Sequence, residues 1–495
     1  MKRFTPYILL LLLCVACNTK VPTEYGENNS IPQIFPDYTA ITIPSNIAPL
    51  NYRITEDANK YIVRISNGEE EYIKSGRTTD IPVKEWNKLL SANNDLQVDI
   101  FLHKNNKWEK YPTITWHIAQ EIDPYISYRL IPPSVESYER LSINQRNLTN
   151  FQEDVIYANS MVQTESNGQC INCHHYRNWG TDQMMFHARQ YLGGTVIIEN
   201  GNMKKINLKT DSTISAGVYP AWHPTHNYIA FSTNKTRQSV HTNMNNRIEV
   251  FDTESDLILF NTANNSVSII ENDSTELECF PAWAPDGKSL YYVSAYLDYD
   301  FGPQREEYII NNHQNIHYNL YRKSFNPETA TWGEPELIYD AAAEHKSITL
   351  PRISPDGRYL MFTMGDYGVF HIWHKDADLY MMDLKSGETR PLTEINSNDV
   401  ESYHSWSSNG KWIIFSTRRD DGGFTRLYLS HLKDNGQFTK PFPLPQQDPD
   451  YANSFMFSYN IPEFMKEPVK ITPQEIASFF KNSETIQANF TKAAK

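Results

Sequence analysis

The stretch FPAWAPDGKSLYYVSA, residues 280–295, decides the fold because the chain repeats its pattern three more times. An apolar run that ends at Trp283 is followed by the turn residues Asp286 and Gly287, and then by a second apolar run. Asp-Gly tolerates the positive φ of a tight turn, so the stretch predicts a β-hairpin. The other copies are YPAWHPTHNYIAFSTN at 219–234, LPRISPDGRYLMFTMG at 350–365 and YHSWSSNGKWIIFSTR at 403–418.

Further strand-like runs follow each hairpin, which gives four strands per unit, the composition of a propeller blade. The units are spaced more widely than the roughly 40 to 45 residues of a compact blade, so long loops are inserted. Residues 193–210 add two strands before the first full hairpin, and residues 451–464 are a candidate closing strand. The pattern predicts a mainly β chain with a ring of five or six blades over 192–465.

These units resemble the repeats of the TolB-type β-propeller family. The resemblance implies a propeller that binds proteins, saccharides or small molecules. Some propellers of this type are the non-catalytic domain of serine peptidases. The chain has no G-x-S-x-G motif, so a peptidase would lack its nucleophile.

Ahead of the repeats, residues 43–135 carry several alternating or β-branched runs, such as LQVDIFLHK at 96–104. We expect a small β-sandwich of the fibronectin or immunoglobulin type there. The Pro-rich stretch near residue 132 marks a boundary. Residues 136–191 are expected to form a linker with a short helical haem-binding segment, and residues 466–495 a C-terminal helical tail.

That linker contains CINCH, residues 170–174, and C-x-x-C-H is the attachment signature of a c-type haem. The stretch resembles a cytochrome c site. By that resemblance Cys170 and Cys173 would form thioethers to one covalent haem c, and His174 would be the proximal iron ligand. A disulfide or thiol pair is an alternative, and so is a zinc site that adds His174 or His187 to the two cysteines.

The sixth iron ligand is expected from TDQMMFHARQYLGG, residues 181–194. Thr181 or Asp182 can cap a short helix, on which Met184 and His187 share a face. His187 or Met184 is therefore the candidate distal ligand. TolB-like propellers with C-x-x-C-H before the GGT strand resemble the chain as a whole, which implies an exported haem lipoprotein of a Bacteroides-like bacterium.

The N-terminus, MKRFTPYILLLLLCVACNTK, has the layout of a signal peptide over residues 1–16. The junction before Cys17 resembles a bacterial lipobox, which implies that Cys17 is lipidated. Residues 17–42 would then be a flexible tether. We expect an outer-membrane-anchored protein that faces the periplasm or the exterior, held by lipid without a membrane span.

Lys plus Arg number 45 and Asp plus Glu 59, a formal net charge of −14, which argues against nucleic acid as a partner. The function that these features predict is one-electron transfer or redox sensing, with the propeller docking an envelope redox or membrane-protein partner. The alternative is a non-redox binding scaffold whose propeller recognises a glycan or envelope protein, with haem or zinc serving stability.

Overall fold

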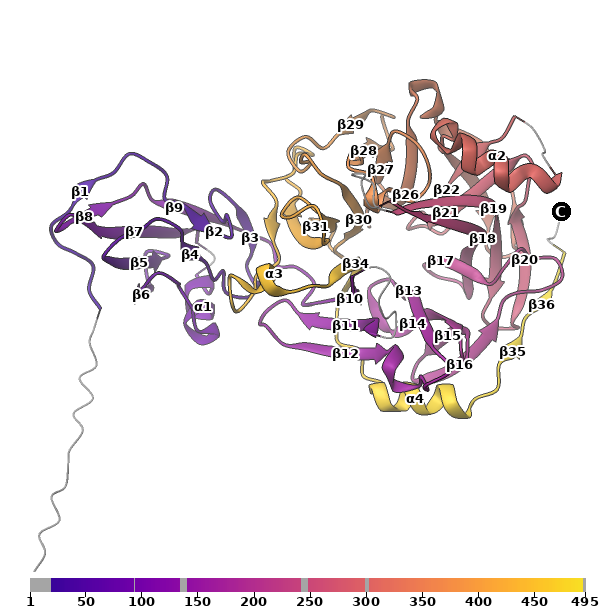
Figure 1. The fold of residues 1–495 in the computed structure, drawn as a ribbon, viewed down its shortest axis with the longest axis horizontal. Coiled ribbons are helices and arrows are strands. Elements are labelled where there is room, and N and C mark those ends of the chain that lie inside the picture. Colours follow the sequence, from indigo (N-terminus) through magenta and orange to yellow (C-terminus); the bar gives the residue numbers. More distant parts are fainter. Residues whose placement is uncertain (1–18, 93, 134–139, 242–247, 299–301, 493–495) are drawn as a thin grey trace, which may run out of the picture.

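A computed structural model describes residues 19–92, 94–133, 140–241, 248–298 and 302–492. The predicted signal peptide and Cys17 lie outside these residues. A smaller N-terminal β unit stands beside a larger ring of sheets (Figure 1). None of the described helices is both long and apolar enough to cross a membrane.

The ring is a six-bladed β-propeller, which confirms the mainly β class and fixes the blade count. The innermost strands contact one another in the order β13, β17, β21, β26, β30, β34 and back to β13. Blade 1 is β13 (Gln169–Arg177), β14 (Gly180–Gln190), β15 (Gly194–Glu199) and β16 (Asn202–Asn207); blade 2 is β17 (Gly217–Trp222), β18 (Tyr228–Val240), β19 (Ile248–Asn261) and β20 (Ser266–Glu271). Blade 3 is β21 (Glu276–Trp283), β22 (Ser289–Tyr296), β23 (Asn319–Asn326), β24 (Thr331–Trp332) and β25 (Glu336–Tyr339). Blade 4 is β26 (Ser347–Ile353), β27 (Tyr359–Gly365), β28 (Asp378–Asp383) and β29 (Thr389–Pro391); blade 5 is β30 (Glu401–Trp406), β31 (Trp412–Thr417), β32 (Arg426–His431) and β33 (Phe442–Pro443).

Blade 6 closes the ring with strands from both ends of the propeller sequence. Its innermost strand is β34 (Ser458–Met465), and β10 (Tyr125–Ile131), β11 (Ser142–Asn147) and β12 (Glu153–Ala158) follow outward. The expected closing strand within 451–464 is thus confirmed, since β34 pairs antiparallel with β10. The predicted boundaries at 135 and 192 were wrong, because β10, β11 and β12 belong to the propeller.

The haem segment was expected to be helical from Thr181, and this was wrong as well. Residues 180–190 are β14, which pairs with β13 on one side and β15 on the other. Met184 to Ala188 are all buried, so buried and exposed residues do not alternate along this run. The sequence therefore lacks the pattern by which a strand is predicted. The helical turn of the expected linker is the short 3-10 helix η2 (Asn159–Met161).

The N-terminal unit contains a branched seven-stranded sheet and a separate two-stranded sheet of β2 and β4, whereas a β-sandwich of the fibronectin or immunoglobulin type was expected. One edge of β7 is shared, because its first residues pair with β9 and its last residues with β8. The expected tether over 17–42 is corrected in part, since β1 to β3 begin inside it and Tyr38 is fully buried. The elements are β1 (Gly26–Glu27), β2 (Ile34–Phe35), β3 (Thr42–Pro44), β4 (Arg53–Ile54), β5 (Lys60–Ser66), β6 (Glu71–Ser75), α1 (Val83–Leu90), β7 (Leu96–Lys104), β8 (Lys107–Lys110) and β9 (Ile114–Ala119).

This unit shares a hydrophobic core with blade 5. Trp86 of α1 and Trp116 of β9 belong to the same buried cluster as Trp412 of β31. At the seam Trp412 Nε1 donates to the Gln120 carbonyl at 2.9 Å, and the Ser408 amide donates to Asp123 at 2.6 Å. Burial of large aromatic side chains on both sides holds the two parts together.

The C-terminal tail is only partly helical. Helix α4 (Pro473–Asn482) begins with a capping box between Thr472 and Glu475. Two short strands follow, β35 (Ile486–Gln487) and β36 (Asn489–Phe490), which extend blades 1 and 2 by parallel pairing. The remaining short helices are η3 (Gly302–Gln304), α2 (Arg305–Asn312), η4 (His313–Asn315), η5 (Ala342–Glu344), η6 (His371–Trp373) and α3 (Tyr451–Ser454).

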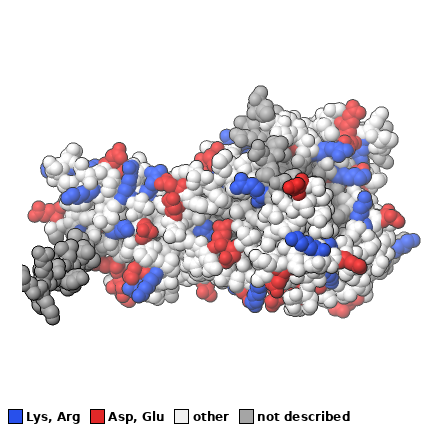
Figure 2. Space-filling view, turned by 60° about the horizontal axis from the view of Figure 1, so that its bottom comes forward, with Lys and Arg blue, Asp and Glu red and all other residues white. Residues whose placement is uncertain are grey.

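Charged side chains of both signs are interspersed over the face shown in Figure 2. That face presents no continuous basic stripe of the kind that follows a nucleic-acid backbone.

Candidate functional site

A β-bulge recurs in the innermost strand of every blade. At the same place in each strand the register with the neighbouring strand shifts, and one residue that is not glycine takes a positive φ. Such residues are uncommon and mark places where the chain is held by its surroundings. They are Cys173 (55°), Tyr219 (48°), Phe280 (53°), Leu350 (54°), Tyr403 (48°) and Ile461 (48°).

The C-x-x-C-H stretch is therefore the blade 1 copy of the propeller repeat. Cys173 and His174 occupy the bulge that Tyr219 and Pro220 form in blade 2. Sequence reasoning missed this copy because Cys-His-His-Tyr differs from Tyr-Pro-Ala-Trp at all four aligned positions. The available signal was an aromatic residue, Tyr176, followed by turn residues at the spacing of the other units.

The bulge residues surround a small cavity of about 30 Å³ on the propeller axis. Cys173, His174 and His175 contribute to its wall from blade 1. A space of this size holds about one water molecule.

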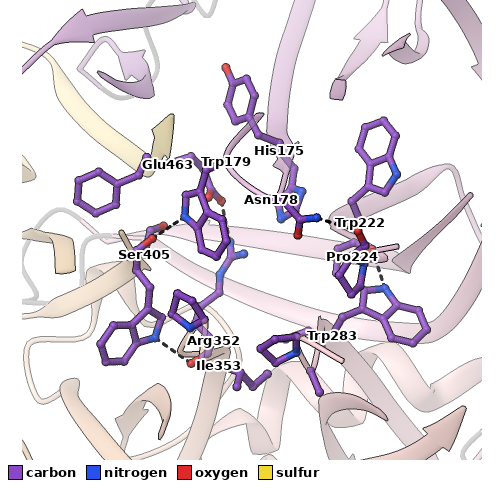
Figure 3. Close-up of a pocket in the computed structure, with 18 of the residues that line it drawn as sticks. His175, Asn178, Trp179, Trp222, Pro224, Trp283, Arg352, Ile353, Ser405 and Glu463 are labelled. Atoms are coloured by element: carbon purple, nitrogen blue, oxygen red, sulfur yellow. Dashed lines mark hydrogen bonds and ion pairs between the residues drawn. The ribbon is translucent and has the colours of Figure 1, made fainter. Parts of the chain in front are cut away.

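A larger pocket of about 320 Å³ opens at one mouth of the ring (Figure 3). The residue two places after each positive-φ residue lies in its wall, so six equivalent positions face one space. Blades 2 and 3 contribute methyl groups, whereas the other four blades contribute polar side chains. The six residues are His175, Ala221, Ala282, Arg352, Ser405 and Glu463.

The polar residues form a buried wall with a central ion pair. Arg352 Nη2 donates to Glu463 Oε1 at 3.0 Å. Burial raises the pKa of Glu463, and Arg352 opposes the shift. Burial, with Arg352 and His174 nearby, holds the pKa of His175 well below its usual range, so this ring is neutral at neutral pH.

Trp179 extends over the same pocket from the tight turn between β13 and β14. Asn178 and Trp179 both have positive φ, 49° and 62°, which is strained for a tryptophan. The turn is tied down on both sides: Asn178 Nδ2 donates to the Pro224 carbonyl of blade 2 at 2.8 Å, and Trp179 Nε1 donates to the Trp406 carbonyl of blade 5 at 2.8 Å. These bonds hold the indole at the mouth, where Figure 3 shows it between Ser405 and Arg352.

The two cysteines of the motif lie in different surroundings, each as a free thiol. Cys170 is opposite Arg189 in the ladder and packs on the core between blades 1 and 6. Cys173 is the positive-φ residue of the bulge and lines the axial cavity.

The predicted iron ligands are also dispersed. His174 is buried, neither ring nitrogen makes a hydrogen bond of normal geometry with a described residue, and burial lowers its pKa to about 3. His187 is buried in β14 and bonds Thr195 Oγ1 through Nδ1 at 3.1 Å, while Met184 is fully buried in the hydrophobic core. His404, which takes the place of His174 in blade 5, bonds the Met361 carbonyl of blade 4 through Nε2 at 3.1 Å. A histidine at this bulge position thus packs between blades.

A covalent haem does not fit these residues as they are folded. The cavity beside Cys173 and His174 holds about one water molecule, and Cys170 lines neither that cavity nor the mouth pocket. Within the described part of the chain, no group of three or more His, Cys, Asp or Glu residues is placed to hold a metal ion. The unpartnered nitrogens of His174 are among the buried polar atoms here that a bound group would satisfy.

Comparison with known proteins tells less about the fold of this chain than its own strand pairing does. No protein-family model and no curated protein matches the chain. The β-propeller domain of the Trilobed protease from Pyrococcus furiosus matches with a TM-score of 0.33 and 10% identity, over 81% of this chain and 96% of that one. An oligogalacturonate lyase in complex with manganese also matches, with a TM-score of 0.31 and 14% identity over 82% of this chain and 99% of that one. A cobalt-substituted apocarotenoid oxygenase of Synechocystis matches with a TM-score of 0.37 and 12% identity, over 86% of this chain and 98% of that one. Likenesses this distant concern the fold alone.

Proposed function

We propose that this protein is a ligand-binding protein of the cell envelope, whose propeller takes up a small organic molecule in the mouth pocket. The observation that carries the proposal is the asymmetry of the six equivalent positions. Two alanines leave open space on one side, and Arg352, Ser405, Glu463 and His175 gather on the other. A concave site of a few hundred Å³ with apolar walls and a few convergent polar groups is typical of ligand pockets.

Binding is favoured over hydrolysis by the contacts of Ser405. Its hydroxyl donates to the Pro462 carbonyl of blade 6 instead of to a histidine. A nucleophilic serine needs an adjacent base to accept its proton, whereas this hydroxyl is directed at a backbone carbonyl. This agrees with the sequence, which has no nucleophile elbow.

The envelope location is proposed from the sequence alone, by the resemblance to TolB-like lipoproteins. A Cys17→Ala variant expressed in a Gram-negative host tests it. The variant is expected to move from the membrane fraction to the soluble fraction of the envelope. Retention in the membrane would count against lipidation at Cys17.

Ligand binding is tested by thermal shift and tryptophan fluorescence of the full mature chain with a library of sugars, uronic acids and aromatic acids. Trp179 at the pocket mouth is expected to report binding. Ala282→Leu fills the open side of the pocket and should abolish the response, whereas Ala263→Leu, in an exposed turn, should not. The proposal fails if no library compound gives a response that Ala282→Leu removes.

Covalent haem attachment, which would require the C-x-x-C-H segment to fold differently from strand β13 described above, is the second candidate, with one-electron transfer or redox sensing toward an envelope partner. The buried His174 ring, whose nitrogens make no hydrogen bond of normal geometry with a described residue, favours it. Expression with a haem-maturation system, followed by intact mass, tests it directly. An added haem mass that a Cys170→Ser, Cys173→Ser double variant loses and Cys279→Ser keeps would establish attachment; an unmodified chain would exclude it.

A further inference from the structure

Of the described residues that line the mouth pocket, Arg352 is the one lysine or arginine. Among the described residues its guanidinium makes a single hydrogen bond, to Glu463, although the group carries five N–H donors. The side chain is 27% exposed, and this exposed part faces the pocket. Unused donors in a concave site are a place for a planar acceptor, because a guanidinium binds a carboxylate through two parallel hydrogen bonds.

The wall formed by blades 2 and 3 is apolar. Ala221 and Ala282 stand where the other blades carry larger side chains, and Trp283 also lines the pocket. A flat or ring-shaped organic body can rest against this side while an acidic group reaches the guanidinium.

We propose, on the basis of the ligand-binding function proposed above, that the pocket selects a small organic carboxylate, with its anionic group on Arg352 and its body against Ala221 and Ala282. A neutral molecule of the same shape lacks the charge-assisted pair and binds less tightly. The ligand carboxylate and Glu463 then share the same guanidinium.

Glu463 then determines how binding depends on pH. The groups that face it are Arg352 of β26, Ser405 of β30, and Tyr176 and His175 of β13. His175 is neutral and Tyr176 is a phenol, so once the ligand is bound two carboxylates face the single guanidinium of Arg352. When two carboxylates share a site with one cation, the buried one takes up a proton from solvent. Binding of one anion is therefore expected to take up close to one proton and to tighten as the pH falls toward 5.

Isothermal titration of the full mature chain with two matched pairs tests this: glucuronate against glucose, and benzoate against benzamide. Titrations at pH 5.5 and 7.5, in buffers with different ionisation enthalpies, give the proton count. At least one carboxylate is expected to bind about tenfold or more tightly than its neutral partner, as one charge-assisted pair provides. Arg352→Gln should remove the preference, and Arg358→Gln, an exposed arginine of the same hairpin, should keep it.

Glu463→Gln provides an independent readout, because the neutral amide keeps the shape of the side chain. This variant should bind the carboxylate with no proton uptake and with affinity independent of pH. Equal affinity for both members of each pair would overturn the anion proposal and leave ligand binding intact. No binding of the carboxylates, with a response from other library compounds, would do the same. No response to any compound would overturn both proposals.

Discussion

Arg352 of β26 is bonded to Glu463 of β34 at 3.0 Å, so blade 4 is tied to blade 6 across the front of blade 5. Glu463 lies on the strand that closes the ring, and its side chain is only 12% exposed. The same ion pair therefore contributes to ring closure and forms the polar wall of the pocket.

Replacing Arg352 by Met should destabilise the fold by about 1–3 kcal/mol, because it leaves Glu463 buried without a cation. Glu463→Gln should reduce the free energy of unfolding by less, because the neutral amide leaves no unpaired carboxylate in the interior. Urea denaturation at pH 7 measures both values. Arg358→Met, in an exposed pair with Asp383, is the matched control and should leave stability unchanged. Wild-type stability of Arg352→Met would show that the pair does not help to close the ring.

His174→Pro should be tolerated if CINCH is a propeller repeat. Four of the six blades have proline at this bulge position, namely Pro220, Pro281, Pro351 and Pro462. The free energy of unfolding is expected to change by about 1 kcal/mol or less, because proline is accommodated at bulges.

Ile171→Pro, three residues earlier in β13, is the contrasting variant. Its amide donates to Asn159 Oδ1 at 3.1 Å, and its side chain is fully buried. Loss of this bond and the clash of the ring should cost about 3 kcal/mol or more. If His174→Pro unfolds the chain as Ile171→Pro does, His174 has a role that the repeat does not explain.

Prediction from the sequence succeeded for hairpins in which characteristic turn residues lie between runs of alternating apolar and polar residues. It failed for segments that lack these signals. Asp286-Gly287 and Asp356-Gly357 identify their hairpins because few other residue pairs suit such turns. β14 was not identified, because its central residues are buried on both faces and show no alternation. The pocket was also missed: Arg352 and Glu463 are far apart in sequence, and only the closure of the ring brings them together.

Glu278 of β21 should make stability depend on pH in the alkaline range. It is fully buried, and burial, with Asp256, Glu271 and Glu276 nearby, raises its pKa to about 9. A carboxyl whose folded pKa is raised contributes stability that is complete below its unfolded pKa and is lost as the pH rises through the folded pKa. Its contribution therefore falls between about pH 4.5 and pH 9.

Glu278→Gln removes this titration, so the variant should gain stability relative to wild type as the pH rises. Each pH unit within the window is worth about 1.4 kcal/mol, which gives a few kcal/mol by pH 8 as an order of magnitude. Urea denaturation at pH 5, 7 and 8.5 measures the difference. Glu334→Gln, at an exposed site, should show no such trend. A difference that is constant with pH would mean that Glu278 is ionised in the folded protein.

The seam between the N-terminal unit and blade 5 should depend on Asp123. Its carboxylate accepts from both the amide and the hydroxyl of Ser408, each at 2.6 Å, and only 8% of the residue is exposed. Asp123→Ala leaves the Ser408 amide without its acceptor, so a loss of about 2–3 kcal/mol is expected, as for hydrogen bonds to a charged group. Because the two parts share a core, thermal unfolding of the wild type should be a single transition, and the variant should separate it into two. Asp154→Ala removes a carboxylate that accepts from the side-chain amide of the exposed Gln152, and this variant should behave as wild type. A single unshifted transition in Asp123→Ala would show that the aromatic core alone couples the two parts.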